Sequence, residues 1–229
     1  MSIYTISDLH LPLGIDKPMD IFGKSWENYV ERIQQNWLGL IKDDDTVILG
    51  GDFSWATYLE EAYEDFKFLE TLPGMKILLK GNHDYWWTTA AKLNKFMEEK
   101  GFKTIGFLHN NSCKIHNTGI CGTRGWSLDS LGSEEDKKIY DRELLRLKMS
   151  LDSAKDCAER IVFTHFPPVT KTALGTEFHK ILCEYGVKKC IYGHLHGQSH
   201  GSAFTGECDG IEYILASGDY LGFMPLKIM

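Results

Sequence analysis

The feature that most constrains this chain is a short, β-rich apolar run that recurs along it, followed each time by a turn and an amphipathic segment. Alternation of strands and helices in this way predicts a largely parallel core sheet with helices on its faces. The runs are Ile3 to Ile6, Val47 to Leu49, Lys76 to Leu79, Ile161 to Phe163, Cys190 to Tyr192 and Ile211 to Leu215.

Helices are predicted between the early runs, where apolar residues recur at helical spacing within 26–40, 59–69 and 90–97. A longer helix is predicted from Glu134 to Ala158, and Ser133 with Asp136 resembles a capping pair at its start. From Thr104 to Gly122 the pattern changes to short β segments between turns. This change favours a second sheet packed on the first.

Composition describes one ordinary domain over residues 1–229, with 43% hydrophobic residues and no linker-like or repeated segment. The formal charge is −7, from 25 basic and 32 acidic residues, so general binding to nucleic acids or anionic lipids is not expected. Apolar runs are far shorter than the ~20 residues that span a bilayer. The amino terminus has no basic segment followed by an apolar stretch, and we expect a cytoplasmic location.

The six cysteines are scattered along the chain without a Cys-x-x-Cys pair. This spacing argues against a zinc knuckle, a redox motif or a disulfide framework. We expect reduced thiols that lie mostly in the core.

Five of the six apolar runs end directly in a cluster of Asp, Asn and His. The carboxyl ends of the strands in an open α/β sheet lie along one edge, so these clusters should converge in space. Any one cluster is explained by an ordinary turn, but all five at strand ends indicate a metal site. The clusters are Ser7-Asp8-Leu9-His10, Gly50-Gly51-Asp52, Gly81-Asn82-His83-Asp84, Thr164-His165 and Gly193-His194-Leu195-His196.

The glycines in these clusters, at positions 50, 51, 81 and 193, are predicted to let the backbone turn sharply from strand to loop. The four histidines outside the clusters receive no role in this interpretation. They are His109, His116, His179 and His200.

The ordered set of clusters, from Asp8 to His196, resembles the signature of the calcineurin-like metallophosphoesterases. The resemblance covers most of the chain and is specific because the complete set is present. It implies an α/β fold of the family's type, a four-layer α-β-β-α sandwich with two central mixed sheets and a dinuclear metal site at the carboxyl ends of the strands.

The resemblance also implies which residues hold two metal ions. Asp8, His10 and His196 would hold one, Asn82, His165 and His194 would hold the other, and Asp52 would bridge them. Carboxylate, amide and imidazole ligands without thiolate suit Mn²⁺, Fe or Zn²⁺ better than Ca²⁺. Two metals ~3.5 to 4 Å apart acidify a bridging water, so that the metal-bridging hydroxide attacks phosphorus in line with the leaving group.

Other residues near the predicted metal ligands are also candidates for the site. The resemblance makes His83 the catalytic residue that stabilises or protonates the leaving oxygen. Asp84 either supports that loop or is a turn-forming carboxylate. Arg124, with flanking glycines at positions 122 and 125, suits substrate phosphate recognition, although a surface arginine is the common alternative. Trp55 and the aromatic stretch 85–87 line a substrate pocket or belong to the core.

A departure from the family pattern limits the range of substrates that we expect. Protein phosphatases of the superfamily carry Gly-Asp-x-x-Asp-Arg-Gly, whereas residues 51–57 here read Gly-Asp-Phe-Ser-Trp-Ala-Thr. We therefore expect a phosphoesterase acting on a small or nucleotide-like phosphodiester. The alternatives are a phosphomonoesterase, a non-catalytic scaffold of the same fold, or a nuclease, which would need a basic groove that the net charge does not indicate. Protein partners stay open.

Overall fold

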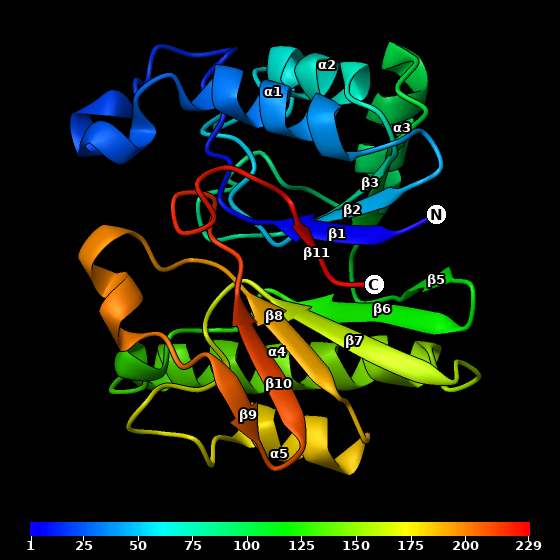
Figure 1. Ribbon diagram of the computed structural model, residues 1–229. Helices are drawn as coiled ribbons and strands as arrows, with labels where there is room; N and C mark the ends of the chain where they lie inside the picture. The colour runs from blue at the N-terminus through cyan, green and yellow to red at the C-terminus, as the bar shows by residue number, and fades with distance from the viewer.

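The computed structural model describes residues 1–229 and has two β-sheets between two layers of helices (Figure 1). The helices are α1 (Tyr29–Leu40), α2 (Tyr63–Thr71), α3 (Ala90–Lys100), α4 (Glu134–Ser153) and α5 (Glu177–Glu184). The strands are β1 (Ile3–Ile6), β2 (Thr46–Leu49), β3 (Met75–Leu79), β4 (Ile105–Leu108), β5 (Cys113–Ile115), β6 (Thr118–Thr123), β7 (Glu159–Thr164), β8 (Lys189–Tyr192), β9 (Gly206–Cys208), β10 (Ile211–Leu215) and β11 (Leu226–Lys227).

Both sheets are mixed, with a parallel centre and an antiparallel strand at one edge of the first sheet and at both edges of the second. The first sheet has the order β11-β1-β2-β3-β4, and β11 is its antiparallel member. The second sheet has the order β5-β6-β7-β8-β10-β9, with β5 and β9 antiparallel at its edges. Helices α1 to α3 cover the outer face of the first sheet, and α4 and α5 cover that of the second (Figure 1). The four-layer sandwich is therefore confirmed.

Three hydrophobic clusters fill the spaces between the four layers. Strand β2 is apolar throughout because both of its faces are buried. Val47 and Leu49 pack toward the helices, and Ile48 packs toward the other sheet. Strands buried on both faces read as continuous apolar runs rather than as alternating ones. Each such side chain contributes about 1.5 to 3 kcal/mol by leaving water, so both faces of the strand hold the sandwich together.

The predicted long helix is correct at its start and wrong at its end. Ser133 caps α4 by accepting a hydrogen bond from the backbone N–H of Asp136 at 3.0 Å. The helix ends at Ser153 rather than Ala158. The backbone N–H groups of Ala154 and Lys155 donate to carbonyls only three residues back, and that of Ala158 donates to Asn117.

Two of the other predicted helices, α1 and α2, begin later than their apolar patterns, whereas α3 begins at Ala90 as predicted. Trp26 lies in a separate 3₁₀ turn, Lys24–Trp26, and Leu59 precedes the start of α2. Further 3₁₀ turns are Asp20–Phe22, Leu128–Ser130 and Gly197–Ser202. The short β segments predicted between Thr104 and Gly122 are present, but β4 completes the first sheet whereas β5 and β6 belong to the second.

The cysteine prediction is half right. All six thiols are free, yet only Cys121 and Cys190 are buried. Cys113 and Cys208 lie on the edge strands β5 and β9, which leaves them half-buried, and Cys183 is exposed on α5. No helix of the structure has the length and apolar character needed to cross a bilayer.

Candidate metal centre

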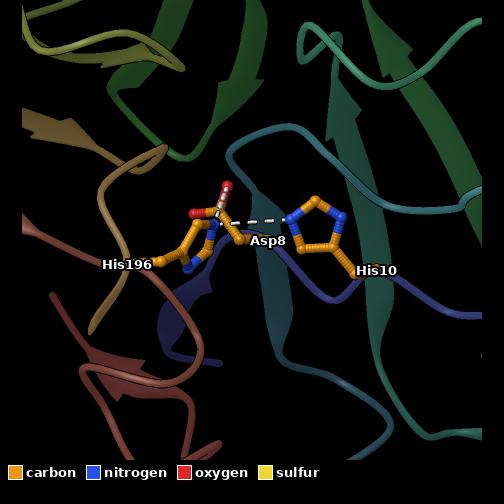
Figure 2. Close-up of side chains that lie close together, drawn as sticks. All are labelled: Asp8, His10 and His196. Carbon is orange, nitrogen blue, oxygen red and sulfur yellow. Dashed lines mark hydrogen bonds and ion pairs between the residues drawn. The ribbon is translucent and has the colours of Figure 1, made fainter. Parts of the chain in front are cut away.

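The predicted clusters converge at one edge of the sandwich, where strands of both sheets end. Figure 2 shows Asp8 and His10 from the loop after β1 facing His196 from the loop after β8. The ligand-type atoms of these three side chains all lie within 4.8 Å of one another. A second group, formed by Asp52, His165 and His194, is equally compact. Residues from distant parts of the sequence thus form two adjacent sets of donors.

Asp52, which belongs to the second group, also lies close to a histidine of the first. Its Oδ2 atom is 3.7 Å from His10 Nε2 and 3.4 Å from His165 Nε2. Asn82 joins the second group through its Oδ1 atom, which is 2.7 Å from His165 Nε2. One carboxylate is therefore within reach of both sets of imidazoles, at the position that suits a bridging ligand.

The backbone at this edge is held in an uncommon conformation. Asp8, His10, Asp52 and His194 have φ values of 60°, 46°, 52° and 72°. The left-handed region is sparsely populated by residues other than glycine, and such residues gather at functional sites. The sharp turn from strand to loop is therefore made by the ligand-type residues themselves.

The glycines of the clusters serve mainly to leave space, which corrects the sequence interpretation. Of the four, only Gly51 has a positive φ, of 104°. A Cβ atom at Gly81 would collide with the Asp52 carboxylate, and one at Gly193 would collide with that of Asp8. The two carboxylates thus pack directly against backbone that only glycine permits.

Asp84 supports the loops rather than simply forming a turn. Its buried carboxylate accepts hydrogen bonds from the backbone N–H groups of Asp52 at 2.9 Å and Gly81 at 2.7 Å. It also accepts from the backbone N–H of Phe53 and from the indole of Trp86. This one side chain ties the loop after β2 to the loop after β3, which fixes Asp52 relative to Asn82.

Asp219 is a site residue that the sequence interpretation missed. Its Oδ1 atom accepts a hydrogen bond from His196 Nδ1 at 2.8 Å, which directs Nε2 of the same ring toward Asp8. A carboxylate in this position is typical of histidines that bind metals, because it fixes the ring and its tautomer. Asp219 follows β10, so the sixth apolar run also leads to an acidic residue at this edge, and that was the available signal.

Electrostatics divides the four imidazoles of the two groups into pairs. Burial lowers the pKa of His10 and His194 to about 4, so their rings are neutral near pH 7. Burial also opposes the charge on His165 and His196, but Asp52 raises the pKa of His165 to about 9, and Asp219 and Asp8 raise that of His196 to about 10.

The two carboxylates are ionised. Burial disfavours their charge, yet the neighbouring imidazoles outweigh it and hold the pKa of Asp8 and of Asp52 below the usual range. Buried anionic oxygens and four imidazoles, of which His10 and His194 are already neutral and His165 and His196 would release a proton on binding, join an amide oxygen in a donor set without thiolate. Such a set fits divalent ions such as Mn²⁺, Fe²⁺ or Zn²⁺. The residues present therefore fit the metal cofactors expected for this site.

His83 lies beside the two groups and belongs to neither. Its backbone N–H donates to Asp52 Oδ1 at 2.8 Å, and its ring centroid is 4.7 Å from that of Trp55. Burial lowers the pKa of His83. The ring borders a pocket of about 460 Å³ whose other walls include His10, Trp26 and Trp55. Trp55 therefore lines a pocket, whereas Trp86 is buried in the core.

Arg124 is not a surface arginine, which removes that alternative. Its side chain is 17% exposed and lies 3.8 Å from the buried Glu143. The guanidinium stacks over the ring of Trp126, and its Nε atom is buried without a hydrogen-bond partner. Arg124 lines a second pocket of about 320 Å³, together with Lys80 and Arg146.

Solved structures similar to this chain share its fold. A protein of unknown function from Aquifex aeolicus is 21% identical with a TM-score of 0.55, over 99% of this chain and 95% of that one. The phosphopantetheinyl hydrolase of Mycobacterium tuberculosis is 13% identical with a TM-score of 0.60, over 100% and 95%. A Thermus thermophilus protein is 17% identical with a TM-score of 0.51, over 85% and 81%. Among curated proteins, no sequence matches the chain significantly.

The family comparison is more specific than these likenesses of fold. The model of the calcineurin-like phosphoesterases matches residues 1–198, which include every cluster predicted from the sequence. Family members use divalent metals to hydrolyse phosphate esters, and the two donor groups are suited to such ions. The chain belongs to the calcineurin-like phosphoesterase family and is a metal-dependent hydrolase of phosphate esters.

Proposed function

We propose that this hydrolase acts on small or nucleotide-like phosphodiesters and uses two divalent ions. The observation that carries the proposal is the position of the Asp52 carboxylate, whose Oδ2 atom lies 3.7 Å from His10 and 3.4 Å from His165. A carboxylate shared between two sets of ligands is the arrangement needed for a two-metal site.

The proposed ligand sets follow the two groups of side chains. The first ion is held by Asp8, His10 and His196, the second by Asn82, His165 and His194, and both by Asp52. Manganese, iron and zinc all suit these donors. When bound, a pair of such ions neutralises phosphate oxygens and acidifies water for attack on phosphorus.

The chain's own residues orient the ligands and handle the leaving group. Asp219 holds the His196 ring so that Nε2 lies 3.6 Å from Asp8, where it would be available to the first ion. Asp84 holds the backbone of Asp52 through a 2.9 Å hydrogen bond. His83 is proposed to donate a proton from its imidazole to the leaving oxygen. Burial lowers the pKa of His83, which makes its protonated ring a stronger acid for that step.

The two pockets support a substrate with two organic substituents. The pocket beside His83 is lined by Trp26 and Trp55, whose flat faces suit a nucleobase or another planar leaving group. The other pocket carries Arg124, Lys80 and Arg146, but the buried Glu143 offsets part of their charge through a 2.7 Å ion pair with Arg146. A partly neutralised basic pocket suits the single negative charge of a diester better than the dianion of a monoester.

The test compares a bis-aryl phosphate with the matching mono-aryl phosphate, using protein stripped by a chelator and then restored with Mn²⁺. We expect no turnover in stripped protein and a higher kcat/KM for the diester after restoration. A tenfold or greater preference for the monoester would replace the diester proposal with a phosphomonoesterase. Failure of metal-loaded protein to hydrolyse either ester would contradict both.

A further inference from the structure

A second cluster of metal-binding side chains lies far from the candidate metal centre, at the opposite end of β10. Asp219 follows the carboxyl end of this strand, whereas the second cluster surrounds its amino end, where the β9–β10 hairpin meets α5 (Figure 1). The helix contributes His179 and Cys183, and the hairpin contributes Cys208 and Asp209.

The donor atoms of this cluster are close together. His179 Nε2 is 2.9 Å from Asp209 Oδ2 and 3.5 Å from Cys183 Sγ. The ligand atoms of His179, Cys208 and Asp209 all lie within 4.8 Å of one another. Zinc bonds of ~2.0 to 2.3 Å in a tetrahedral site place neighbouring donors ~3.3 to 3.8 Å apart. The donors of His179, Cys208 and Asp209 are therefore spaced for one ion, and Cys183 lies next to them through its 3.5 Å contact with His179 Nε2.

The elements that present these donors are well defined. His179 and Cys183 are four residues apart on α5 and so share one face of the helix. Cys208 pairs with Ile211 across a two-residue turn, in which Asp209 and Gly210 have φ values of 49° and 76°. Positive φ at both central residues is typical of the tight hairpin turn that Asp-Gly favours. Asp209 is thus held beside Cys208 by the turn itself.

The buried side of the cluster also resembles a metal site. His179 is 4% exposed, and its Nδ1 atom is 2.6 Å from the hydroxyl of Tyr213. A partner on one ring nitrogen fixes the histidine and leaves the other nitrogen for a ligand. A simple His179–Asp209 hydrogen bond would explain only those two residues. It would leave unexplained why the thiols of Cys183 and Cys208 come to the same place from different elements.

We propose that His179, Cys183, Cys208 and Asp209 bind one structural Zn²⁺ ion. Two thiolates, an imidazole and a carboxylate favour zinc, and four protein ligands leave no position open for substrate. The ion would join α5 to the β9–β10 hairpin. Because thiolates and imidazole bind the metal in deprotonated form, loading the site releases the thiol protons to solvent.

The test uses Co²⁺ as a spectroscopic probe of the whole chain, kept reduced with a phosphine that does not bind the metal. Cobalt bound to thiolate gives a charge-transfer absorption band in the near ultraviolet, and the candidate metal centre has no thiolate that could produce it. We expect this band in the unaltered protein. It should be lost or halved in Cys183→Ser and Cys208→Ser, and retained in the control Cys157→Ser, whose half-buried thiol lies outside the cluster.

Elemental analysis provides a second readout. The zinc-loaded protein should contain one more equivalent of zinc than either cluster variant, and Asp52→Asn should keep the cobalt–thiolate band even without phosphoesterase activity. Absence of the band in the unaltered protein, or its persistence in a Cys183→Ser/Cys208→Ser double variant, would overturn the proposal. A Cys183–Cys208 disulfide that persists in zinc-treated protein despite the added reductant would also overturn the proposal.

Discussion

The two ends of β10 carry ligand-type clusters of different character. At its carboxyl end, Asp219 joins a buried set of carboxylates and imidazoles in which Asp8 and Asp52 have left-handed backbone. At its amino end, Cys208 and Asp209 belong to a two-residue hairpin turn in which Asp209 is also left-handed, and the Asp209 side chain is 72% exposed. Carboxylates packed tightly against glycine backbone are found at the end that forms the candidate metal centre, whereas the left-handed residues at the other end belong to an Asp-Gly hairpin turn.

This difference shows that one fold can hold a candidate catalytic site and a candidate structural metal site at opposite ends of the same strand. Parallel strands of both sheets bring their carboxyl ends to the same edge, so a reactive site can draw ligands from β1, β2, β3, β7 and β8. The cluster at the other end of β10 draws its donors only from the β9–β10 hairpin and α5, which makes it a local cluster. We therefore expect changes at the two ends to have separable effects.

The largest expected effect comes from Asp52→Asn. Loss of the shared carboxylate should weaken both ions and lower diester turnover by more than ~10³-fold, beyond the ~10 to 100-fold typical of residues that only support ligands. Metal content and kcat are the measurements. If the variant keeps two ions and its activity, Asp52 is not a bridging ligand.

His83→Ala should separate proton transfer from metal binding. We expect turnover of an alkyl ester to fall by ~10² to 10⁴-fold, because its leaving oxygen needs a proton. The loss should be much smaller for a nitrophenyl ester, and both ions should stay bound. Equal losses for the two esters, or loss of an ion, would remove His83 from the proposed role.

Asp219→Asn should have an intermediate effect. An amide holds the His196 ring less firmly, so we expect metal affinity or activity to fall by ~10 to 100-fold. Excess metal should restore much of the activity, as expected for a residue that acts through a ligand. The matched control is Glu212→Gln, an exposed acid on β10, the strand that precedes Asp219, and this change should leave metal affinity unchanged.

The smallest effect is expected for Arg124→Ala. Loss of one charge-assisted hydrogen bond should raise the KM for the diester about 10-fold and change the ratio of diester to monoester specificity. Arg142→Ala is the control, because Arg142 also lies near Glu143 but is 52% exposed. An unaltered ratio in the Arg124 variant would exclude a direct contact with substrate.

Much of the fold was predictable because its signals are local. Ile3–Ile6 and Ile211–Leu215 are strands with the predicted bounds, since their apolar side chains fill the space on the two sides of each sheet. The end of α4 was not predictable, because Ala154 and Ala158 continue its apolar stripe although the chain leaves the helix at Ala154 and Ala158 bonds to the distant Asn117. That residues 1–229 form one domain stays a prediction.

The candidate site was predictable where ligands follow strands directly and not where they depend on tertiary contacts. Asp219 lies beyond β10 in an ordinary Ser-Gly-Asp turn, and its role emerges only because β10 pairs with β8 and so lies next to His196. His179 was left without a role for a similar reason. Its neighbours Cys208 and Asp209 are brought to it by the packing of α5 on the hairpin.

The central claim, a two-metal phosphodiesterase, is tested most directly by titrating metal-free protein with Mn²⁺ while recording bound metal and bis-aryl phosphate hydrolysis together. Manganese binds thiolate sites weakly, so the ions should enter the candidate metal centre rather than the cysteine cluster. We predict negligible activity below one equivalent and full activity as the second equivalent binds. Full activity with a single bound ion, or hydrolysis without metal, would contradict the account.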